Sequence, residues 1–236
     1  MIQRLEQLYE GKAKQVFLTN DPDLYVVLYK DVATAFDGSK KDVFSGKGSY
    51  NAKISTILFT LLETRNIPTH FERLLDDTTM LVKRLEIIPL EVVIRNVVAG
   101  SLAERLGFNE GEALLKPVVE FYYKSDALHD PIVNEDHIRV LGIASMAQVQ
   151  EIRKTALIIN EILRARFDAI GIMLIDIKLE FGIHKGKILL GDEISPDTCR
   201  LWDKTTHEKL DKDRFRRDLG GIMEAYQEVL VRLSEK

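Results

Sequence analysis

Apolar and charged residues alternate along residues 172–184, which predicts a β-strand with two unlike faces. Side chains two residues apart on a strand share a face, so Asp176, Lys178 and Glu180 lie together on one side. The opposite face is apolar and consists of Ile175, Ile177, Leu179 and Phe181. We therefore expect a strand with a charged, chemically reactive face that is backed by the hydrophobic core.

The turn-prone residues 184–186 predict that this strand folds back onto the apolar run 187–190 as a β-hairpin. That fold brings Asp192 within a residue or two of Glu180, and opposed residues on paired strands have Cβ atoms roughly 5 Å apart. Neighbouring carboxylates favour a cation between them, and Mg²⁺ accepts one or two carboxylates together with phosphate oxygens. We interpret Glu180 and Asp192 as a magnesium–nucleotide site with Lys178 facing the same phosphates. From the pattern alone, the alternative is the solvated face of a half-buried sheet.

The remaining pattern predicts an α+β fold with two lobes, divided near residues 86–89 into domains 1–86 and 87–236. The first, mainly antiparallel β lobe is expected to contain strand-like runs over residues 8–18, 24–30 and 79–85. One amphipathic helix is expected over residues 49–65. In the second, larger α/β lobe, we expect the strand 91–98, the hairpin, a helix that begins at a capping box of Ser145 and Gln148, and a last helix over about 213–233.

Composition restricts the function classes without naming one. The 236 residues include 33 basic and 37 acidic side chains, so the net charge of −4 leaves no electrostatic signature of nucleic-acid binding. The single cysteine, Cys199, excludes an intrachain disulfide and fits a reducing compartment. No apolar run reaches the roughly 18 residues of a membrane helix, and the amino terminus lacks the apolar region of a signal peptide. We expect a cytoplasmic protein without a nucleic-acid or membrane partner.

The segment Glu10–Lys14 is a second candidate for phosphate binding. Gly11 allows a tight turn between two strand-like runs, where backbone N–H groups can approach a phosphate. Lys12 and Lys14 are two residues apart on the outgoing strand and are expected to point the same way. The segment is neither a Walker A loop nor a G-x-G-x-x-G fingerprint, and an ordinary hairpin turn is the alternative.

Five segments together resemble the phosphoribosylaminoimidazole-succinocarboxamide synthases, or SAICAR synthetases, of purine biosynthesis. They are YEGKAKQVF at 9–17, PLEVVIRNVVAGSL at 89–102, HDPIVNE at 129–135, LIDIKLEFG at 174–182, and GDEISPD with RLWD at 191–203. The resemblance implies a two-lobed ATP-binding fold, distantly similar to kinases and ATP-grasp enzymes, and a homodimer. It implies an ATP-dependent ligase that joins L-aspartate to carboxyaminoimidazole ribonucleotide, releasing ADP and phosphate through an acyl phosphate.

The resemblance also assigns roles to residues. Mg²⁺ is held by Glu180 and Asp192, and the catalytic candidates are Lys178 and Asp176, the latter to orient a reactant or accept a proton. The ATP-binding residues are Gly11, Lys12, Ala13, Lys14, Lys83 and Leu85. The ribonucleotide-binding residues are Glu91, Arg95, Ser101, Asp130 and Arg200. Without the resemblance, Glu91 and Arg95 would be interpreted as a structural salt bridge on one strand face.

Two questions stay open at this stage. The first is which cations bind the dicarboxylate amino acid, because several basic side chains are also compatible with a solvated surface. The candidates are Lys40, Lys41, Lys212, Arg214, Arg216 and Arg217. The second is the class of protein, since a small-molecule or protein kinase, or a non-catalytic nucleotide-binding protein, would use similar lobes. The chain has no H-R-D catalytic loop and no D-F-G motif, which disfavours a protein kinase.

Overall fold

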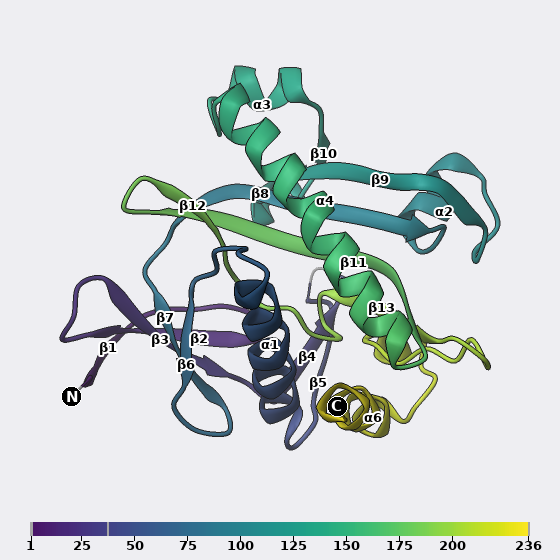
Figure 1. The fold of residues 1–236 in the computed structure, drawn as a ribbon, viewed down its shortest axis with the longest axis horizontal. Helices are drawn as coiled ribbons and strands as arrows, with labels where there is room; N and C mark the ends of the chain where they lie inside the picture. The colour runs from purple at the N-terminus through teal and green to yellow at the C-terminus, as the bar shows by residue number, and fades with distance from the viewer. Residues whose placement is uncertain (1, 37, 236) are drawn as a thin grey trace.

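The computed structural model describes residues 2–36 and 38–235, which form two large β-sheets flanked by three long helices (Figure 1). This arrangement confirms the predicted α+β class. The first part of the chain contains β1 (Arg4–Glu10), β2 (Lys14–Thr19), β3 (Leu24–Tyr29), β4 (Val32–Ala35), β5 (Lys40–Val43), α1 (Lys47–Thr64), β6 (Phe71–Leu74) and β7 (Thr79–Lys83).

The first sheet has the strand order β1-β2-β3-β7-β6, and all neighbouring strands are antiparallel. One face of this sheet packs against α1, because buried residues of the strands, such as Val27 and Val82, share a core with Ile54 and Leu58 of the helix. Strands β4 and β5 form a separate two-stranded ribbon. The three predicted strand-like runs and the predicted helix of this region are confirmed.

The second sheet has the order β10-β9-β8-β11-β12, with β13 also paired to β11. Its strands are β8 (Glu86–Val97), β9 (Ala113–Tyr123), β10 (Ile132–Val133), β11 (Ile172–His184), β12 (Lys187–Leu190) and β13 (Cys199–Asp203), with α2 (Ser101–Leu106), a 3₁₀ turn (Asp126–Leu128) and α3 (Glu135–Leu141) between them. Strand β11 is antiparallel to three partners, β8, β12 and β13, and is therefore the central strand of this sheet.

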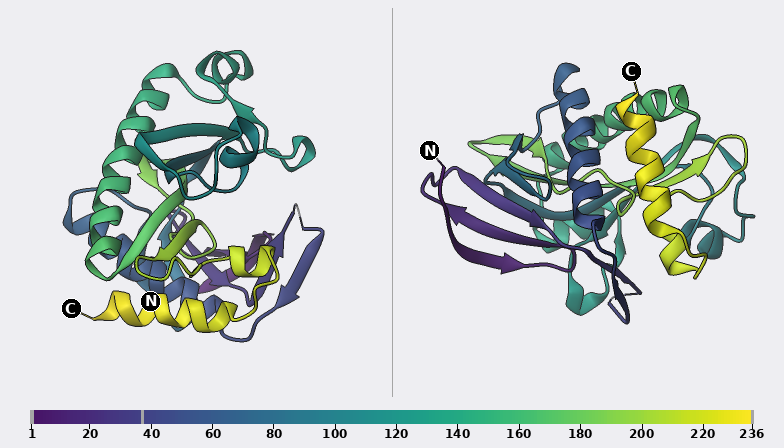
Figure 2. Two further views of the ribbon diagram at one scale, coloured as in Figure 1. Left: turned by 90° about the vertical axis from the view of Figure 1, so that its right-hand side faces the viewer. Right: turned by 90° about the horizontal axis from the view of Figure 1, so that it is seen from below.

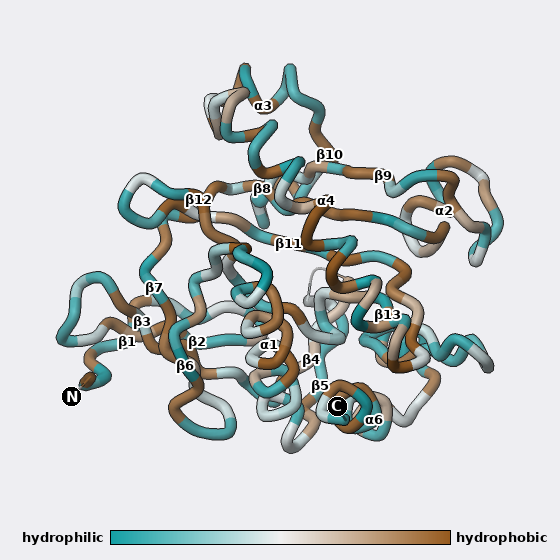
Figure 3. The backbone as a smooth tube through the Cα atoms, in the orientation of Figure 1, coloured by the Kyte–Doolittle hydropathy of each residue, from teal (hydrophilic) through white to brown (hydrophobic). Residues whose placement is uncertain are grey.

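Helix α4 (Met146–Ala169) crosses the second sheet and covers β11 and β8 (Figures 1 and 2). The predicted capping box is confirmed: Ser145 Oγ accepts a bond from the Gln148 amide at 3.2 Å, and Gln148 Oε1 accepts one from the Ser145 amide at 2.8 Å. Hydrophobic and hydrophilic positions are mixed along this helix (Figure 3) because only one face is buried. The buried hydrophobic residues are Val149, Ile152, Ala156, Ile159, Leu163 and Phe167.

One position on the apolar side of β11 departs from the prediction. Ile177, Leu179 and Phe181 belong to the main hydrophobic core, as expected. Ile175 instead packs with Ala99 and Trp202 in a small separate cluster. The reason is a register shift in the pairing of β11 with β13 between residues 174 and 176, which interrupts the strict alternation of faces.

The prediction of one continuous last helix over 213–233 is wrong. The structure contains a short helix α5 (Asp213–Arg216) and a separate helix α6 (Ile222–Ser234). Between them, Asp218, Gly220 and Gly221 have φ angles of 55°, 68° and 62°, a left-handed conformation that ends the first helix. After this break, α6 packs beside α1 (Figure 2).

The chain passes from the first sheet to the second between Lys83, the last residue of β7, and Glu86, the first of β8. The predicted division into domains 1–86 and 87–236 stays a prediction, and α6 contacts α1 across it. In the described part of the chain, every helix is too short or too polar to span a membrane.

A buried ion pair connects the two parts of the molecule. Lys47, the first residue of α1, is fully buried and forms an ion pair with Asp197. Asp197 also accepts hydrogen bonds from Asn51 Nδ2 at 3.0 Å and from the Tyr226 hydroxyl of α6 at 2.6 Å. Burial favours the neutral carboxyl, but the charges of Lys47 and Lys212 and the hydrogen bonds from Lys47 and Tyr226 together hold the pKa of Asp197 well below its usual range.

We expect Lys47→Met to lower the free energy of unfolding by about 3 kcal/mol, since removal of one partner leaves a buried charge uncompensated. Urea denaturation followed by circular dichroism measures this loss. The matched control is Lys53→Met on the same helix, because Lys53 pairs with Asp77 at 3.0 Å in a largely exposed pair worth less than about 1 kcal/mol. Similar losses in both variants would contradict a special role for the buried pair.

Candidate active site

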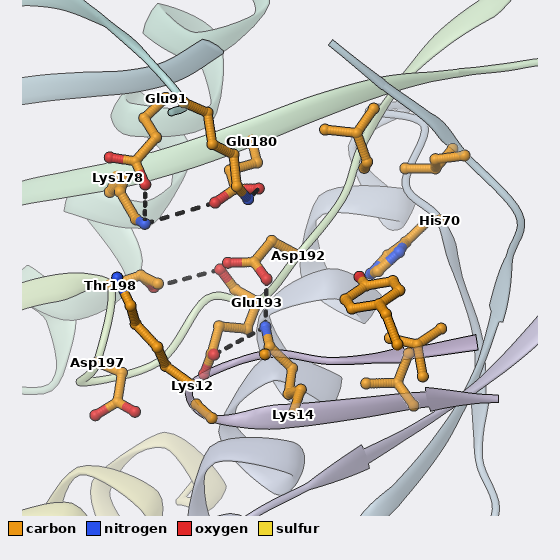
Figure 4. A pocket seen from close by; sticks show the side chains of 18 of the residues that line it. Lys12, Lys14, His70, Glu91, Lys178, Glu180, Asp192, Glu193, Asp197 and Thr198 are labelled. Atoms are coloured by element: carbon orange, nitrogen blue, oxygen red, sulfur yellow. Dashed lines mark hydrogen bonds and ion pairs between the residues drawn. The ribbon is translucent and has the colours of Figure 1, made fainter. Parts of the chain in front are cut away.

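A cavity of about 760 Å³ lies between the two sheets. At one end its walls are apolar and are formed by residues of β2, β3 and β7 and by the connection that follows β7: Val16, Val27, Val82 and Leu85. At the other end its walls carry lysines and carboxylates from both sheets (Figure 4). A pocket with an apolar wall and a few convergent charged groups is the usual form of a small-molecule site.

At the charged end, three of the lining lysines are paired with carboxylates of the same lining. Lys14 contacts Asp192 and lies 2.9 Å from Glu193 Oε1. Lys178 lies 2.5 Å from Glu91 Oε1 and 3.5 Å from Glu180 Oε1. Lys124, the third lysine, contacts Glu180 Oε2.

These contacts decide the charge states of the lysines and of Asp192. Burial alone would lower the pKa of each lysine, but the nearby carboxylates raise the pKa values of Lys14, Lys124 and Lys178 above their ordinary value. Burial likewise favours the neutral form of Asp192, yet the charges of Lys14, Lys178 and Lys124 hold its pKa well below the usual range. The lysines and Asp192 are therefore charged at neutral pH.

The predicted hairpin and the predicted proximity of Glu180 and Asp192 are confirmed. Lys185 and Gly186 form its two-residue turn with φ angles of 49° and 78°, both positive as in a type I′ turn. The amide of Gly191 donates to the carbonyl oxygen of Glu180 at 2.9 Å, so the next residue, Asp192, lies beside Glu180. Figure 4 shows both carboxylates at the charged end of the cavity.

The donor set at this end suits a hard divalent cation bound together with phosphate. Among residues 2–36 and 38–235, no group of three or more His, Cys, Asp or Glu side chains is arranged to hold a metal ion by itself. Glu180 of β11 and Asp192, which follows β12, offer carboxylate oxygens instead. Mg²⁺ is commonly bound by one or two carboxylates with the remaining positions filled by phosphate oxygens and water, so these residues fit it.

The turn at Gly11 lines the cavity, but its lysines differ from the expectation. The amide of Gly11 donates to the carbonyl oxygen of Lys14 at 2.8 Å, which closes the turn. Lys12 precedes β2 and does not lie on it, so strand alternation does not apply to the two lysines. Lys12 is half-exposed and lies 3.1 Å from Asp126, whereas Lys14 points to Asp192. Ala13 lies between them in the lining.

Lys83 and Leu85, which were predicted to bind ATP, line the apolar end of the cavity together with His70. The amides of Lys83 and Arg84 donate to the carbonyl oxygens of His70 at 2.6 Å and of Asp23 at 2.7 Å. Lys83 Nζ lies 3.1 Å from Glu72 Oε1. Burial lowers the pKa of His70 to about 3, so its ring is neutral at the cavity wall.

A second cavity of about 340 Å³ adjoins the first and shares Lys12, Glu91, Asp130 and Lys178 with it. Two of the arginines in its lining meet at one carboxylate oxygen. Asp176 Oδ2 accepts from Arg95 Nη1 at 3.1 Å and from Arg200 Nη1 at 2.8 Å. Two guanidinium groups are thus held side by side.

Each of these arginines has a further carboxylate partner. Arg95 Nε donates to Glu120 Oε2 at 2.7 Å, and Arg200 Nε donates to Asp213 Oδ2 at 2.9 Å. Glu91 pairs with Lys178, while the described carboxylate partners of Arg95 are Glu120 and Asp176. The interpretation of Glu91 and Arg95 as a structural salt bridge is therefore wrong.

Gly100 permits the close packing of Arg200. It has a φ angle of 51°, and a Cβ atom at this position would lie 2.5 Å from Arg200 Nη2. The backbone conformation therefore favours a glycine, and a larger residue would also displace the end of the Arg200 side chain. The next residue, Ser101, accepts a bond from Arg95 Nη2 at 3.1 Å.

With one exception, the residues predicted for the site line one of the two cavities. The exception is Ser101, which reaches the site through Arg95. Glu120, Lys124 and Glu193 also pair with the site residues, and their positions were not predicted from the sequence. Apolar and polar residues alternate at the end of β9 and just after it, and this alternation would have predicted Glu120 and Lys124 on one face of the strand. The signal for Glu193 was its position directly after Asp192.

Comparison with known proteins gives consistent matches along nearly the whole chain. The SAICAR synthetase family model matches residues 7–233. The chain is 57% identical over 233 residues to the phosphoribosylaminoimidazole-succinocarboxamide synthase of Bacillus cytotoxicus, with 98% of both chains covered. It is likewise 57% identical to the synthase of that name from Brevibacillus brevis, again with 98% of both chains covered.

Solved structures agree in fold. A SAICAR synthetase (Type-2) in complex with ADP superimposes with a TM-score of 0.95 at 51% identity, covering 98% of each chain. The phosphoribosylaminoimidazole-succinocarboxamide synthase from Ehrlichia chaffeensis gives a TM-score of 0.95 at 43% identity, covering 98% of this chain and 99% of that one.

The two-sheet α+β fold, with a cavity that joins an apolar pocket to a lysine–carboxylate cluster, defines a two-lobed ATP-using enzyme. Its class is the ligases, in which ATP drives the formation of a new bond. The chain belongs to the SAICAR synthetase family and acts in purine biosynthesis.

Proposed function

We propose that this ligase joins L-aspartate to carboxyaminoimidazole ribonucleotide, giving the succinocarboxamide, ADP and phosphate. The observation that carries the proposal is that an apolar pocket, a lysine–carboxylate cluster and an arginine pair line two adjoining cavities. Lys178 and Glu91 belong to both linings, so groups suited to ATP and to a phosphorylated ribonucleotide adjoin each other. The name of the Bacillus cytotoxicus relative and the ADP complex of a similar structure support the same assignment.

The chemistry explains why ATP is consumed. A carboxylate is a poor electrophile because its leaving oxygen is anionic, so it must be activated before an amide forms. Transfer of the γ-phosphoryl group to the carboxylate oxygen of the ribonucleotide gives an acyl phosphate and ADP. The aspartate nitrogen, after losing a proton, then forms the C–N bond while the C–O bond breaks and phosphate leaves. Catalysis consists mainly of positioning and charge stabilisation.

The adenine base occupies the apolar end of the larger cavity in this proposal, with the phosphates at Gly11, Lys12, Ala13 and Lys14. The backbone of Leu85 supports this placement. The amides of Lys83 and Arg84 are bonded within the protein, whereas in the described residues the amide of Leu85 has no such bond. It is therefore available to a base.

Magnesium is the proposed metal, held by Glu180 and Asp192. When bound there, it would supply positive charge that stabilises the charge developing during phosphoryl transfer. Lys12, Lys14 and Lys178 would neutralise the remaining charge on the transferred group. Lys178 is the proposed catalytic residue, because it lies where the two cavities meet.

Arg95, Arg200 and Ser101 are proposed to bind the phosphate and ribose end of the ribonucleotide, with Glu91 and Asp130 in the same pocket. Asp176 is proposed to orient the two guanidinium groups. Its Oδ2 accepts bonds from both arginines, which favours this role over the alternative that it accepts a proton. Arginine's planar group suits phosphate recognition.

Location and assembly complete the proposal. We infer that the protein works in the cytoplasm, which a buried, unpaired Cys199 supports. We also infer that it forms a homodimer. Val140 and Leu115 are large apolar side chains with 86% and 105% relative exposure, and a second copy would remove such surface from water.

The test of the reaction is ADP and phosphate release with Mg-ATP, with the ribonucleotide and L-aspartate omitted in turn. We expect turnover only when both are present, and one amide product for each ADP. Release of ADP together with a phosphorylated product in the absence of L-aspartate would indicate a kinase. No turnover despite tight Mg-ATP binding would indicate a nucleotide-binding protein without this activity.

Glu180→Gln and Asp192→Asn are expected to reduce turnover by at least about 100-fold without unfolding the protein, because each removes a metal-binding charge. Steady-state rates over a magnesium titration measure the effect. Glu228→Gln is the control, since Glu228 is an exposed residue of α6 that pairs with Arg232. Near-normal rates in either site variant would remove that carboxylate from the metal site.

Arg95→Ala is expected to raise the KM for the ribonucleotide about 10- to 100-fold and to change the KM for ATP less than about twofold, since a charge-assisted hydrogen bond is lost. Arg95→Lys, which keeps the charge, should fall between this variant and the wild type. Equal increases in both KM values would place Arg95 outside the ribonucleotide pocket. Circular dichroism controls for folding.

A further inference from the structure

The end of β4 and the turn after it line the second cavity with apolar side chains. Ala35 and Phe36 belong to this lining, together with Val93 of β8. Among the described residues of the lining, Phe36 is the only one with an aromatic ring. Its side chain is 63% exposed. A large apolar surface is therefore open to a ligand in a cavity whose walls are otherwise mainly charged.

Phe36 has an unusual backbone conformation. Its φ angle is 52°, in the left-handed region that disfavours residues with a Cβ atom and bulky residues most of all. Seven other non-glycine residues of the described chain have a positive φ angle, and all of them are polar. Short polar side chains offset part of the cost through local hydrogen bonds, which phenylalanine cannot form. Backbone strain of this kind is concentrated at functional sites.

Contacts on both sides of Phe36 hold the turn in this conformation. The amide of Gly38 donates to the carbonyl oxygen of Ala35 at 3.1 Å, and that of Ser39 donates to the carbonyl oxygen of Phe36 at 3.0 Å. Lys40, the first residue of β5, donates through its ammonium group to a carbonyl oxygen of α5 at 2.6 Å. The position of Phe36 is therefore set before a ligand binds.

The second sheet presents the charges of this cavity in a fixed order. On β8, Glu91, Val93 and Arg95 are alternate residues and line the cavity together. Val93 is paired with Lys178 of β11, and Arg95 is paired with Asp176. The proposed phosphate site at Arg95 and the proposed phosphoryl-transfer site at Lys178 are thus two residues, or roughly 7 Å, apart along the strands. Val93 contributes apolar surface between the charges.

We propose that Phe36 stacks on the imidazole base of the ribonucleotide and holds it over Val93. This inference rests on the proposed function, in which the phosphate of the ribonucleotide binds at Arg95 and its carboxylate is activated beside Lys178. The base joins these two ends of the substrate, so it lies between them, where the lining is apolar. An aromatic ring binds a planar heterocycle through its face and removes apolar surface from water. Stacking also fixes the plane of the base, which directs its carboxylate toward the γ-phosphate.

Stability and binding have opposite requirements at position 36 in this proposal. Glycine adopts a φ angle of 52° without steric cost, so it would suit the turn better than phenylalanine does. Phe36→Gly is therefore expected to keep or raise the midpoint of thermal unfolding while it raises the KM for the ribonucleotide. A lower midpoint would mean that the ring stabilises the fold, which would contradict its assignment to the ligand.

Steady-state kinetics test the contact. Phe36→Ala is expected to raise the KM for the ribonucleotide about fivefold or more and to leave those for ATP and L-aspartate within about twofold. Phe36→Tyr keeps the ring and should remain close to the wild type, with Phe36→Leu between the two. The Ki of ribose 5-phosphate, which lacks the base, should be the same in all variants. Phe108→Ala is the matched control, because Phe108 is 47% exposed and lies outside both cavity linings.

Fluorescence tests the same contact without turnover. Phe36→Trp places an indole where the base is expected, so its emission should change when the ribonucleotide is added. Mg-ATP and ribose 5-phosphate should leave the emission unchanged. The one native tryptophan, Trp202, is buried and lines neither cavity, and a parallel titration of the wild type corrects for its signal.

Three outcomes would overturn the inference. Equal increases in all three KM values in Phe36→Ala would assign the ring to the structure of the turn. A Phe36→Leu variant as effective as Phe36→Tyr would show that no stacking occurs. Unchanged emission of Phe36→Trp, at ribonucleotide concentrations that saturate the protein in calorimetry, would place the base elsewhere. Failure of the wild type to bind the ribonucleotide would instead refute the proposed function, so the two failures are distinguishable.

Discussion

The pairing of opposite charges along β11 is the interaction on which the site depends. Charged side chains can be buried at acceptable cost only beside partners, and β11 takes its partners from the strands on both sides. Asp176 contacts Arg95 of β8 and Arg200 of β13. Lys178 contacts Glu91 of β8. The charge network therefore requires the observed strand order.

The register of these strands is constrained in the same way. Asp176 is paired directly with Arg95 on one side and with Arg200 on the other, and Glu180 is paired with Glu91. A slip of one residue would turn the charged face of β11 toward the core and bring Ile177 and Leu179 into the cavities. The hydrophobic core under α4 and the charged site thus select the same register from opposite faces of one strand.

Much of this arrangement could be predicted because it depends on short distances along the chain. The alternation of apolar and charged residues along β11 predicted that Asp176, Lys178 and Glu180 share one face. The two-residue hairpin turn predicted that Asp192 lies near Glu180. The same rule failed at Ile175, where a register shift relative to β13 interrupts the alternation. Such a shift depends on the partner strand and not on the local sequence.

Contacts between distant segments could not be predicted by these rules. Lys124 meets Glu180 and Lys47 meets Asp197 across 56 and 150 residues of sequence, and nothing in either segment specifies the other. The break between α5 and α6 had a local signal in Gly220 and Gly221, but the apolar residues after it continue a helical pattern. The short helix α5 ends with Arg216 and directly follows Lys212, so both side chains lie in cavity linings, while the separate helix α6 packs on α1.

The lysine–carboxylate pairs also bear on how a metal and a nucleotide would enter the proposed site. Glu180 and Asp192 already contact Lys124 and Lys14, so Mg²⁺ would compete with two ammonium groups for the same oxygens. Metal alone would leave these ammonium groups beside another cation, which is unfavourable. Phosphate oxygens would remove that conflict, because they could accept contacts from the lysines and leave the two carboxylates available to hold the metal. Electrostatics therefore favours joint binding of Mg²⁺ and the nucleotide over binding of either one first.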